Sequence, residues 1–285
     1  MEAYILKPGA DVLSRNIDDY PEGIIIPIDK PYRWTSADVI RKVKFAAIRH
    51  FGKKNLKVGH AGTLDPLATG VLLVCIGKAT KLAEELQKHD KEYVAGVTFG
   101  ATTPSYDLEK EIDRFFPHEH ISEEAVRNAL PAFIGEQDQI APLFSAKSVD
   151  GVRAYELARK LHKEGKTLDE AAQELIRTAR ISITELELME FHLAPCGQGD
   201  STVLSPTDTT ASSRINVTDN SALGLPRAVI RMACSKGTYV RAFARDLGEA
   251  LGSGAHLDSL QRSRSGIFCV KEALTVDEAV SVLHL

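Results

Sequence analysis

The residues best suited to chemistry lie in one glycine-rich segment, residues 58–80, whose sequence is VGHAGTLDPLATGVLLVCIGKAT. Asp65 is the only acid of this segment, and Pro66, which follows it, restricts the aspartate to extended geometry. The glycines permit close backbone approach and positive φ. A carboxylate held in this way points from a rigid loop just ahead of an apolar run, where it could serve catalysis. An Asx turn or a cap on the next element is the alternative role of an Asp-Pro pair, and the segment alone leaves both open.

A second candidate segment, residues 234–251, reads CSKGTYVRAFARDLGEAL and changes from strand to helix character near Tyr239. Arg241 lies at the start of the expected helix and could form a two-pronged pair with a buried carboxylate, which the planar guanidinium favours. The alternative is a surface helix arginine, because Asp246 and Glu249 offer ordinary partners nearby.

Two segments that look like ligand-binding motifs fail on their spacing. Residues 70–78 resemble a phosphate loop, but six residues separate the glycines, and Ala79 stands where a metal-binding Ser or Thr is required. The triplet at residues 118–120, His-Glu-His, is too compressed for a helical zinc pair, and the four cysteines contain no C-x-x-C spacing. Neither segment therefore supports a phosphate loop or a zinc site.

The composition predicts a folded protein. The 285 residues are 44% hydrophobic and 26% charged, which is ordinary for a globular chain and too apolar for a disordered one. No apolar run approaches the roughly 20 residues that span a bilayer, and the opening residues, MEAYILKPGADVL, lack the pattern of a secretory signal. Because the cysteines are also widely separated, we expect a reduced, cytoplasmic protein.

One stretch departs from the net charge of −4, since residues 41–57 contain seven Lys or Arg and no acid. Net acidity argues against a protein that coats nucleic acid without specificity, because such binding depends on the neutralisation of phosphates. A local basic face remains compatible with RNA contact. The stretch is therefore either a solvated helix face or a surface that contacts phosphates.

The elements that would position these residues alternate irregularly between strand and helix patterns. Residues 1–20 show no sustained periodicity, and we expect them to be poorly ordered. Residues 201–224 are rich in Ser, Thr and turn formers and are expected to form a flexible surface loop. The mixture favours an α+β fold around a mixed sheet. Strands are expected at residues 23–29, 72–76, 93–99, 181–191, 228–235 and 266–270, and helices after N-caps at Ser36 and Ser122 and at residues 155–163, 168–179 and 240–251.

Taken together, these segments resemble the TruB family of tRNA pseudouridine synthases. The resemblance follows the family's order through most of the chain, in the motifs GIIIPIDKPYRWTS, GHAGTLDPLATGVLLVCIGKATKL, KEYVAGVTFGATT, APLFSAKSVDGVRAYELAR and CSKGTYVRAFARDLGEALGSGAHLDSLQRSRSG. It implies the pseudouridine synthase fold, in which helices and loops flank a central, mixed and mostly antiparallel β-sheet. It also implies an isomerase that cuts the N1–C1′ bond of a uridine and rejoins the base through C5, at position 55 in the T loop of tRNA.

By the same resemblance, Asp65 is the catalytic aspartate, and Arg241 is the cation that partners and orients it. The carboxylate must be ionised, so that a buried Asp65 needs a cation close by. Three first steps are open for Asp65: attack on C1′, attack on C6, or removal of the C2′ proton. In each case the base must leave the RNA stack before it can react.

The other site residues implied by the resemblance bind the substrate. His60 matches the histidine that packs against the T loop and helps to extrude the target, and Tyr93 matches the aromatic that stacks on the flipped uracil. Tyr239 would contact the nucleotide, and Leu260 would close an apolar wall. Lys30 matches a position of the opening motif that shapes the site. The resemblance implies no metal and no organic cofactor.

Three features depart from the family pattern. The motif SAKSVDG carries Lys147 one place before Ser148, where the family often has lysine, which leaves the role of that lysine open. The Ser/Thr-rich loop at residues 201–224 lengthens a connection that is normally short. The short tail after the last motif, LTVDEAVSVLHL, does not amount to a complete C-terminal RNA-binding (PUA) domain.

We therefore expect residues 1–22 to be a lead-in and residues 23–285 to form a single catalytic domain. This domain would contain an RNA-binding insertion near residues 101–180 and a flexible loop at residues 196–225. The expected partner is the T stem-loop of tRNA, bound by a monomer that requires no protein partner and no membrane.

Three alternative functions remain. A catalytically silent RNA-binding chaperone could share the fold, but binding alone would not require Asp65, Tyr93 and Arg241 together. A hydrolase based on His60 and Asp65 would need a second catalytic carboxylate or metal ligands, for which the sequence offers no convincing candidate. The third alternative is a synthase of the same kind that acts on another RNA.

Overall fold

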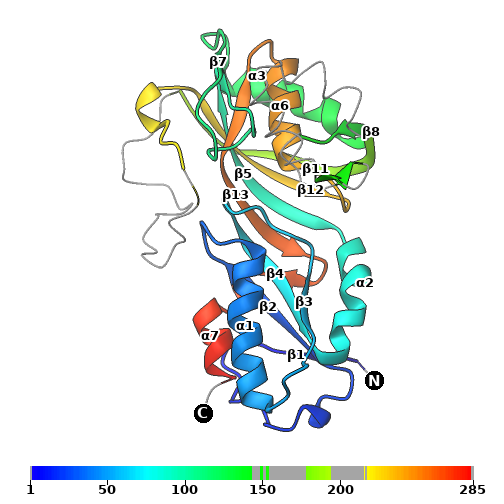
Figure 1. Cartoon of the computed structure of the whole chain (residues 1–285). Coiled ribbons are helices and arrows are strands. Elements are labelled where there is room, and N and C mark those ends of the chain that lie inside the picture. The colour runs from blue at the N-terminus through cyan, green and yellow to red at the C-terminus, as the bar shows by residue number, and fades with distance from the viewer. Residues whose placement is uncertain are drawn as a thin grey trace. The chain divides into compact units, whose positions relative to one another are not determined.

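The computed structural model describes residues 2–142, 148–149, 152–153, 178–193, 215 and 217–283. Within this part of the chain, helices flank a mixed sheet of ten strands, which confirms the expected α+β class (Figure 1). Eight strands follow the order β1-β2-β4-β13-β5-β12-β11-β8, while β3 pairs with β4 and β14 with β13. The strands of this sheet are β1 (Tyr4–Ile5), β2 (Ile24–Lys30), β3 (Val58–Ala61), β4 (Ala68–Ile76), β5 (Lys91–Phe99), β8 (Gly135–Ile140), β11 (Thr178–His192), β12 (Arg227–Cys234), β13 (Ala255–Ser265) and β14 (Phe268–Cys269).

The chain divides into two compact units. The first contains residues 1–94, 204–215 and 260–285, and the second contains residues 95–203 and 216–259. Strands β5 and β13 each contribute residues to both units. The α-helices of the described residues are α1 (Ser36–Phe51), α2 (Ala83–Lys88) and α7 (Val276–Ser281) in the first unit, and α3 (Glu123–Ala129) and α6 (Val240–Ala250) in the second.

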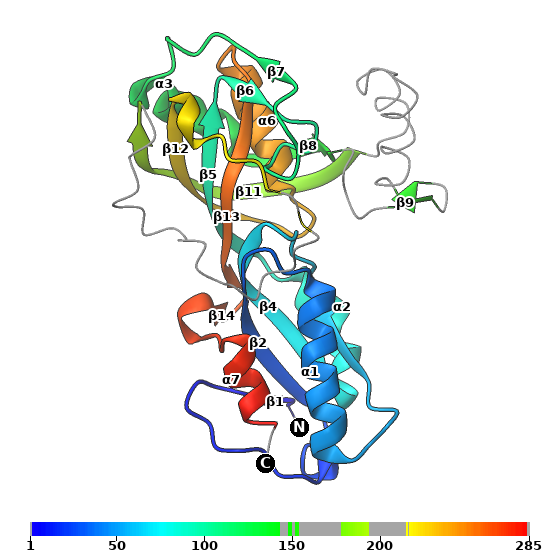
Figure 2. The same ribbon diagram turned by 60° about the vertical axis from the view of Figure 1, so that its left-hand side comes forward.

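The core of the first unit is built around β4, whose nine residues are all buried. Its sequence, ATGVLLVCI, is almost wholly apolar, so both of its faces can be covered. One face contributes Leu72, Val74 and Ile76 to a cluster with residues of α1 and α7. Figures 1 and 2 both show α1 and α7 side by side next to β2 and β4.

The two edges of β4 determine what surrounds the loop that leads into it. On one edge β2 runs antiparallel from Ile24 opposite Ile76 to Lys30 opposite Gly70. The other edge is shared, because β3 pairs with residues 73–76 and β13 pairs with residues 68–70. Residues 62–67 connect β3 to β4, so this loop lies where β3 ends and the pairing with β13 begins.

The N-cap of helix α1 lies one residue earlier than the sequence indicated. Thr35, not Ser36, is the N-cap, and it forms a capping box with Asp38. The Ser36 hydroxyl instead accepts from the Leu64 amide at 2.9 Å and donates to the Leu64 carbonyl at 3.0 Å. The first turn of α1 is thereby bonded to the loop that contains Asp65.

The expectation of a poorly ordered lead-in is corrected by the described residues 2–22. Tyr4 and Ile5 pair in parallel with β2, and a 3-10 turn (η1) covers Ile17–Asp19. Leu6 is fully buried and Leu13 is 5% exposed, and both belong to the core cluster of the first unit. The lead-in orders because its few apolar side chains, although they follow no period, complete this core.

The second unit contains an antiparallel arrangement of β12, β11 and β8, together with the short pair β6 (Ala101–Thr102) and β7 (Arg114–Phe115). Helix α3 starts at the predicted N-cap, Ser122, whose hydroxyl accepts from the Ala125 amide. A 3-10 turn, η3 (Leu130–Phe133), follows, and Phe133 packs edge-on against Phe243 of α6 at 5.4 Å between ring centroids.

The predicted elements at residues 23–29, 72–76, 93–99, 181–191, 228–235 and 240–251 are confirmed with shifted ends. The strand expected at 266–270 is reduced to β14. Four strands of the ten-stranded sheet, β1, β3, β8 and β13, were missed, as were the two-residue strands of the two small sheets. The helix expected at 155–163 lies outside the described residues. Of the helix expected at 168–179, residues 168–177 also lie outside them, and the last two residues belong to β11. Among the described residues, the structure contains no helix with the length and hydropathy to span a membrane.

Candidate active site

Asp65 lies in the six-residue connection between β3 and β4, and its side chain is partly buried. The loop is held by its backbone, since the Asp65 carbonyl accepts from the Ala68 amide at 3.1 Å and the Pro66 carbonyl accepts from the Arg33 amide at 3.0 Å. Neighbouring Leu64 is 4% exposed and belongs to the core cluster of the first unit. The carboxylate therefore projects from a loop that is fixed on both sides of it.

Lys30, the last residue of β2, supports the same loop from inside the protein. Its side chain is fully buried, and its ammonium donates to the carbonyls of Pro31 at 2.9 Å, Trp34 at 2.5 Å and Pro66 at 3.3 Å. Burial lowers the pKa of Lys30 to about 7, although the charges of Asp65 and Asp29 oppose the shift. Lys30 thus joins the opening motif to Pro66, the residue that follows Asp65.

Arg262 in β13 is a buried residue of this site that the sequence reasoning missed. Its exposure is 2%, and its Nε donates to the Val71 carbonyl at 2.7 Å while its Nη2 donates to the Gly62 carbonyl at 3.0 Å. The main chain of Arg262 pairs with Gly70, which has φ +96°, and a Cβ built on Gly70 would lie 2.2 Å from the Arg262 carbonyl oxygen. Arg262 therefore contacts the Asp65 loop through its side chain and strand β4 through its main chain.

His60 lies on β3, opposite Val74, and is partly buried. Desolvation, followed by the charge of Arg262, lowers the pKa of His60 below its ordinary value of 6.5. Its Nδ1 is buried and has no hydrogen-bond partner within the described residues. The ring is therefore neutral near pH 7, with one nitrogen that the described structure leaves unsatisfied.

Tyr93 and Leu260 complete the set of predicted residues in the first unit. Tyr93 lies on β5, Leu260 opens the part of β13 that pairs with β4, and both are partly buried against the core cluster that contains Leu64. The first unit thus carries four of the six predicted site residues, Asp65, His60, Tyr93 and Leu260.

The second unit carries Arg241, and it is a buried residue. Arg241 lies in the first turn of α6, is 5% exposed, and donates through Nη1 to the Ser105 carbonyl at 3.1 Å. Its Nε lies 3.7 Å from the Oδ2 atom of Asp107, which is 7% exposed. The surface-arginine alternative is therefore wrong, and Asp246 pairs with Arg245 instead. The pairing of Arg241 with Asp65 joins the two units and stays a prediction.

Asp107 had not been identified from the sequence, because it stands in a polar stretch, TTPSYDLEK, that resembles any hydrophilic loop. In the structure its Oδ1 accepts from the Ser105 hydroxyl at 2.6 Å and from the Glu109 amide at 3.0 Å. Both bonds are accepted by Oδ1, and the other oxygen, Oδ2, is the one that lies near Arg241. The only signal available in the sequence was the Asx-turn pattern, which is too common to single out a site.

Tyr239 precedes α6 as its N-cap and is held through its main chain. Gln139, which is 3% exposed in β8, accepts from the Tyr239 amide at 2.8 Å and donates to its carbonyl at 3.1 Å. Lys147 lies outside the described residues. Among the described residues, no three His, Cys, Asp or Glu side chains gather into a metal-binding group.

The chain matches the model of the TruB family pseudouridylate synthase (N terminal domain) over residues 49–202. It is 47% identical over 259 residues to tRNA pseudouridine synthase B of Phocaeicola vulgatus, covering 91% of this chain and 92% of the relative. With the protein of the same name from Deinococcus radiodurans, the identity is 38% over 255 residues, covering 89% of this chain and 77% of the relative.

A solved structure shares the fold. The chain aligns with a chain of the crystal structure of a Cbf5-Nop10-Gar1 complex at a TM-score of 0.58 and 24% identity, covering 98% of this chain and 63% of that one. The identity is low, but the fold is the one that the motifs implied. The family model, the extent of the identities and the shared fold agree, and the chain belongs to the TruB family of pseudouridylate synthases.

Proposed function

We propose that this protein converts uridine to pseudouridine in tRNA, at position 55 of the T loop, with Asp65 as the catalytic group. The proposal rests on the family to which the chain belongs and on one observation, namely that side chains from several elements hold the Asp65 loop in place. Ser36, Lys30 and Arg262, from three different elements, all bond to residues within three positions of Asp65. A carboxylate that must meet one atom of a flipped nucleotide benefits from such preorganisation.

The charges around Asp65 suit a group that acts as an anion. Within the first unit, Lys30 interacts electrostatically with Asp65. We assign Arg241 as the further cation that orients the carboxylate when RNA is bound. Its own partner, Asp107, would then keep the guanidinium in place. An ionised carboxylate can attack a carbon atom or accept a proton, which are the two kinds of first step that the isomerisation allows.

The remaining predicted residues are assigned to the nucleotide. The neutral ring of His60 suits contact with an unstacked base, because it brings no charge that must be desolvated. Tyr93 and Leu260 offer partly buried apolar surface on which a flipped uracil can stack, which offsets part of the cost of leaving the RNA helix. Tyr239 would contact the same nucleotide from the second unit.

The proposal includes the wider expectations from the sequence. The protein would act as a monomer on the T stem-loop, in the cytoplasm, with neither a cofactor nor a protein partner. Residues 23–285 would serve as one catalytic domain, and the insertion near residues 101–180 would take part in RNA binding.

The test follows the hydrogen that is lost from C5 when the base is rejoined through that carbon. A T-arm stem-loop and a full tRNA, both tritiated at C5 of their uridines, are incubated with the wild-type protein, with Asp65→Asn and with Asp277→Asn. Asp277 is an exposed carboxylate that serves as the matched control. We expect release of tritium to water with the wild type and with Asp277→Asn and none above background with Asp65→Asn.

Two outcomes would overturn the proposal. Equal release by Asp65→Asn would show that another group carries the chemistry. Tight binding of both RNAs by a folded wild type without any release would instead favour the silent chaperone or a synthase of another RNA.

A further inference from the structure

Six of the seven basic side chains at residues 41–57 fall into two groups in the structure, and the seventh, Lys53, is exposed and belongs to neither. Arg41 is paired with Asp38 at 2.9 Å and Lys42 with Asp277 at 2.6 Å. The guanidinium of Arg49 lies over the exposed ring of Phe45, 5.6 Å from its centroid. These charges of helix α1 are therefore used within the protein, which is the behaviour of a solvated helix face.

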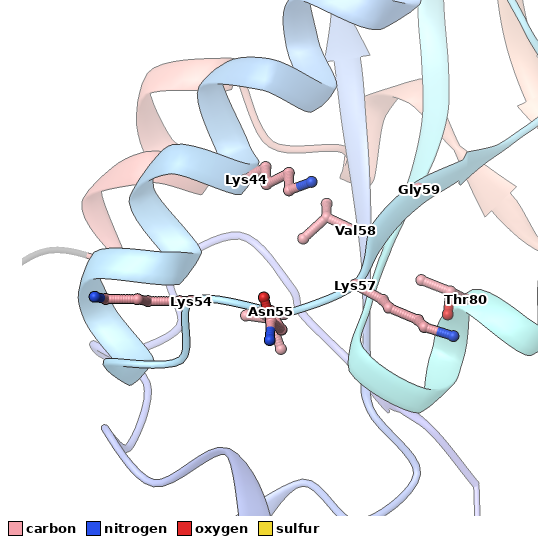
Figure 3. A pocket seen from close by; sticks show the side chains of 8 residues that line it. Lys44, Lys54, Asn55, Lys57, Val58, Gly59 and Thr80 are labelled. Atoms are coloured by element: carbon pink, nitrogen blue, oxygen red, sulfur yellow. The ribbon is translucent and has the colours of Figure 1, made fainter.

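Lys44, Lys54 and Lys57 form the second group, and all three line one hollow of about 470 Å³. Each is exposed, and within the described part of the chain none is paired with a carboxylate. Figure 3 shows Lys44 reaching from α1 toward Val58 and Lys57 reaching toward Thr80. The lining is completed by Asn55, Leu56, Val58, Gly59 and Thr80, so it contains no acid.

The backbone around the hollow is fixed by a buried side chain and a hydrogen bond. Leu56 is 4% exposed and anchors the segment between α1 and β3 in the core of the first unit. The Lys57 carbonyl accepts from the Gly77 amide at 2.8 Å, at the start of the 3-10 helix η2 (Gly77–Leu82). A Cβ built on Gly59 would meet nothing nearer than the Thr80 methyl carbon at 4.0 Å. The hollow beside these lysines is thus not filled at Gly59 by a side chain.

This lining has the charge that suits an anion. Three lysines line this hollow and no acid does, although the chain as a whole has a net charge of −4, so the hollow is a locally basic surface. Asn55 and Thr80 add hydrogen-bonding groups without negative charge. Compact, strongly hydrated ammonium groups on flexible stems suit phosphate oxygens that need no fixed geometry.

We propose that the hollow lined by Lys44, Lys54 and Lys57 docks the phosphate backbone of the RNA substrate, at a distance from the reacting nucleotide. The inference rests on the proposed function for the identity of the RNA. The hollow lies at the Val58 end of β3, whereas the Asp65 loop begins after Ala61 at the other end. At roughly 3.3 Å per residue, the two ends are about 10 Å apart. An RNA strand that enters the site can therefore reach the hollow a few nucleotides away from the target.

The test compares a triple variant, Lys44→Gln with Lys54→Gln and Lys57→Gln, with the wild type and with Arg41→Gln. The control removes one cation of the same run that is already paired. Binding of a T-arm stem-loop is measured from 0.05 to 0.4 M salt, and turnover is measured at saturating RNA. We expect the Kd of the triple variant to rise by about tenfold or more near physiological salt, with kcat unchanged and the slope of log Kd against log salt reduced by about two.

Two binding results would overturn the inference. One is a Kd and a salt slope for the triple variant equal to those of Arg41→Gln. The other is weaker binding with an unchanged salt slope, because the lost contact would then not involve phosphate. A wild type that binds RNA through these lysines but forms no pseudouridine would refute the proposed function and leave the docking surface in place.

A second measurement requires no variant. Lys44, Lys54 and Lys57 are acetylated with and without the stem-loop, and their labelling is followed by mass spectrometry of the wild-type protein. We expect protection by the RNA and none by inorganic phosphate at the same phosphate concentration. Equal protection by inorganic phosphate would identify a site for a small free anion and contradict docking of an RNA backbone.

Discussion

The guanidinium of Arg262 holds the carbonyl of Gly62, with 3.0 Å between Nη2 and the carbonyl oxygen. Gly62 is the first residue of the loop that carries Asp65, and the same guanidinium also bonds to Val71 of the strand that follows the loop. The buried side chain of Arg262 therefore links the first residue of the candidate catalytic loop to the strand that follows the loop. In this way Arg262 acts as a positioning residue, and its substitution should affect turnover more than RNA binding.

Arg262→Lys is expected to lower kcat by about tenfold or more with little change in KM, because one ammonium cannot reproduce both bonds of the guanidinium. Stability should fall by about 1–3 kcal/mol, since a buried carbonyl is left without its donor. Single-turnover rates and urea unfolding measure the two effects. Arg264→Lys, at a half-exposed position in the same strand, is the control. An unchanged kcat in a destabilised Arg262→Lys protein would reduce Arg262 to a structural role.

The buried pair of Arg241 and Asp107 should be sensitive to the loss of either partner. Asp107→Asn keeps the shape of the side chain but leaves the Arg241 charge without this counter-ion, and we expect a loss of about 3 kcal/mol in the free energy of unfolding. Glu187→Gln, which removes a partner of Arg231 on the exposed side of β11, should cost less than about 1 kcal/mol. Chemical denaturation measures both variants. Equal costs would show that burial adds nothing to the Arg241 pair.

Lys30 should give the protein a pH-dependent stability. Its pKa is about 7 in the folded state and near 10.5 when unfolded, so between these values the unfolded chain binds more protons. Stability therefore rises with pH across this window, by up to about 1.4 kcal/mol per pH unit, and the cost of burying the charge is fully present below pH 7.

Lys30→Met removes this contribution. The difference in unfolding free energy between the wild type and Lys30→Met should accordingly move in favour of the wild type as the pH rises from 7 to 10. Urea titrations at several pH values provide the measurement. A difference that does not vary with pH would mean that the folded pKa of Lys30 is not depressed.

Gly70 should not tolerate a side chain. It has φ +96°, and an added Cβ would lie 2.2 Å from the carbonyl oxygen of Arg262, which is main chain and cannot move aside. Gly70→Ala is expected to lower stability by several kcal/mol or to prevent folding. Gly9→Ala is the matched control, because Gly9 also has positive φ, +77°, but nothing lies within 4 Å of its added Cβ. The control should lose only the backbone strain, about 1–2 kcal/mol. Similar melting temperatures for the two variants would contradict the contact with Arg262.

The strands differ in how far their own residues predicted them. Strand β4 is apolar over most of its length and was found from its pattern alone, apart from its first four residues, Ala68 to Val71. Strand β13, with the sequence AHLDSLQRSRS, carries too many polar residues to be recognised. It forms because it lies between β4 and β5 in the sheet and because its polar groups are satisfied, for example Ser263 by Glu92 at 2.7 Å.

The edge strand β8 shows the same effect more strongly. Its sequence, GEQDQI, has no strand signal, and it becomes a strand by pairing with β11 from Ile140 opposite Thr178 to Gly135 opposite Ile183. Its one buried polar side chain, Gln139, bonds to both main-chain groups of Tyr239. Local propensity reports how a segment behaves alone, and here the partner strand decides the outcome.

By itself, the sequence determined most of the apolar strands β2 and β4, the start of α3 at Ser122, the Asp65 loop and, through its motifs, the family. These features depend on residues close together in the chain, whose spacing expresses propensity and burial directly. The tertiary structure alone decided that Arg262 bonds to the loop, that Asp107 pairs with Arg241, and which lysines of the basic run line the hollow beside β3. The physical reason is that each of these depends on an electrostatic contact, or its absence, between segments far apart in the chain, and strand register and helix packing determine those contacts.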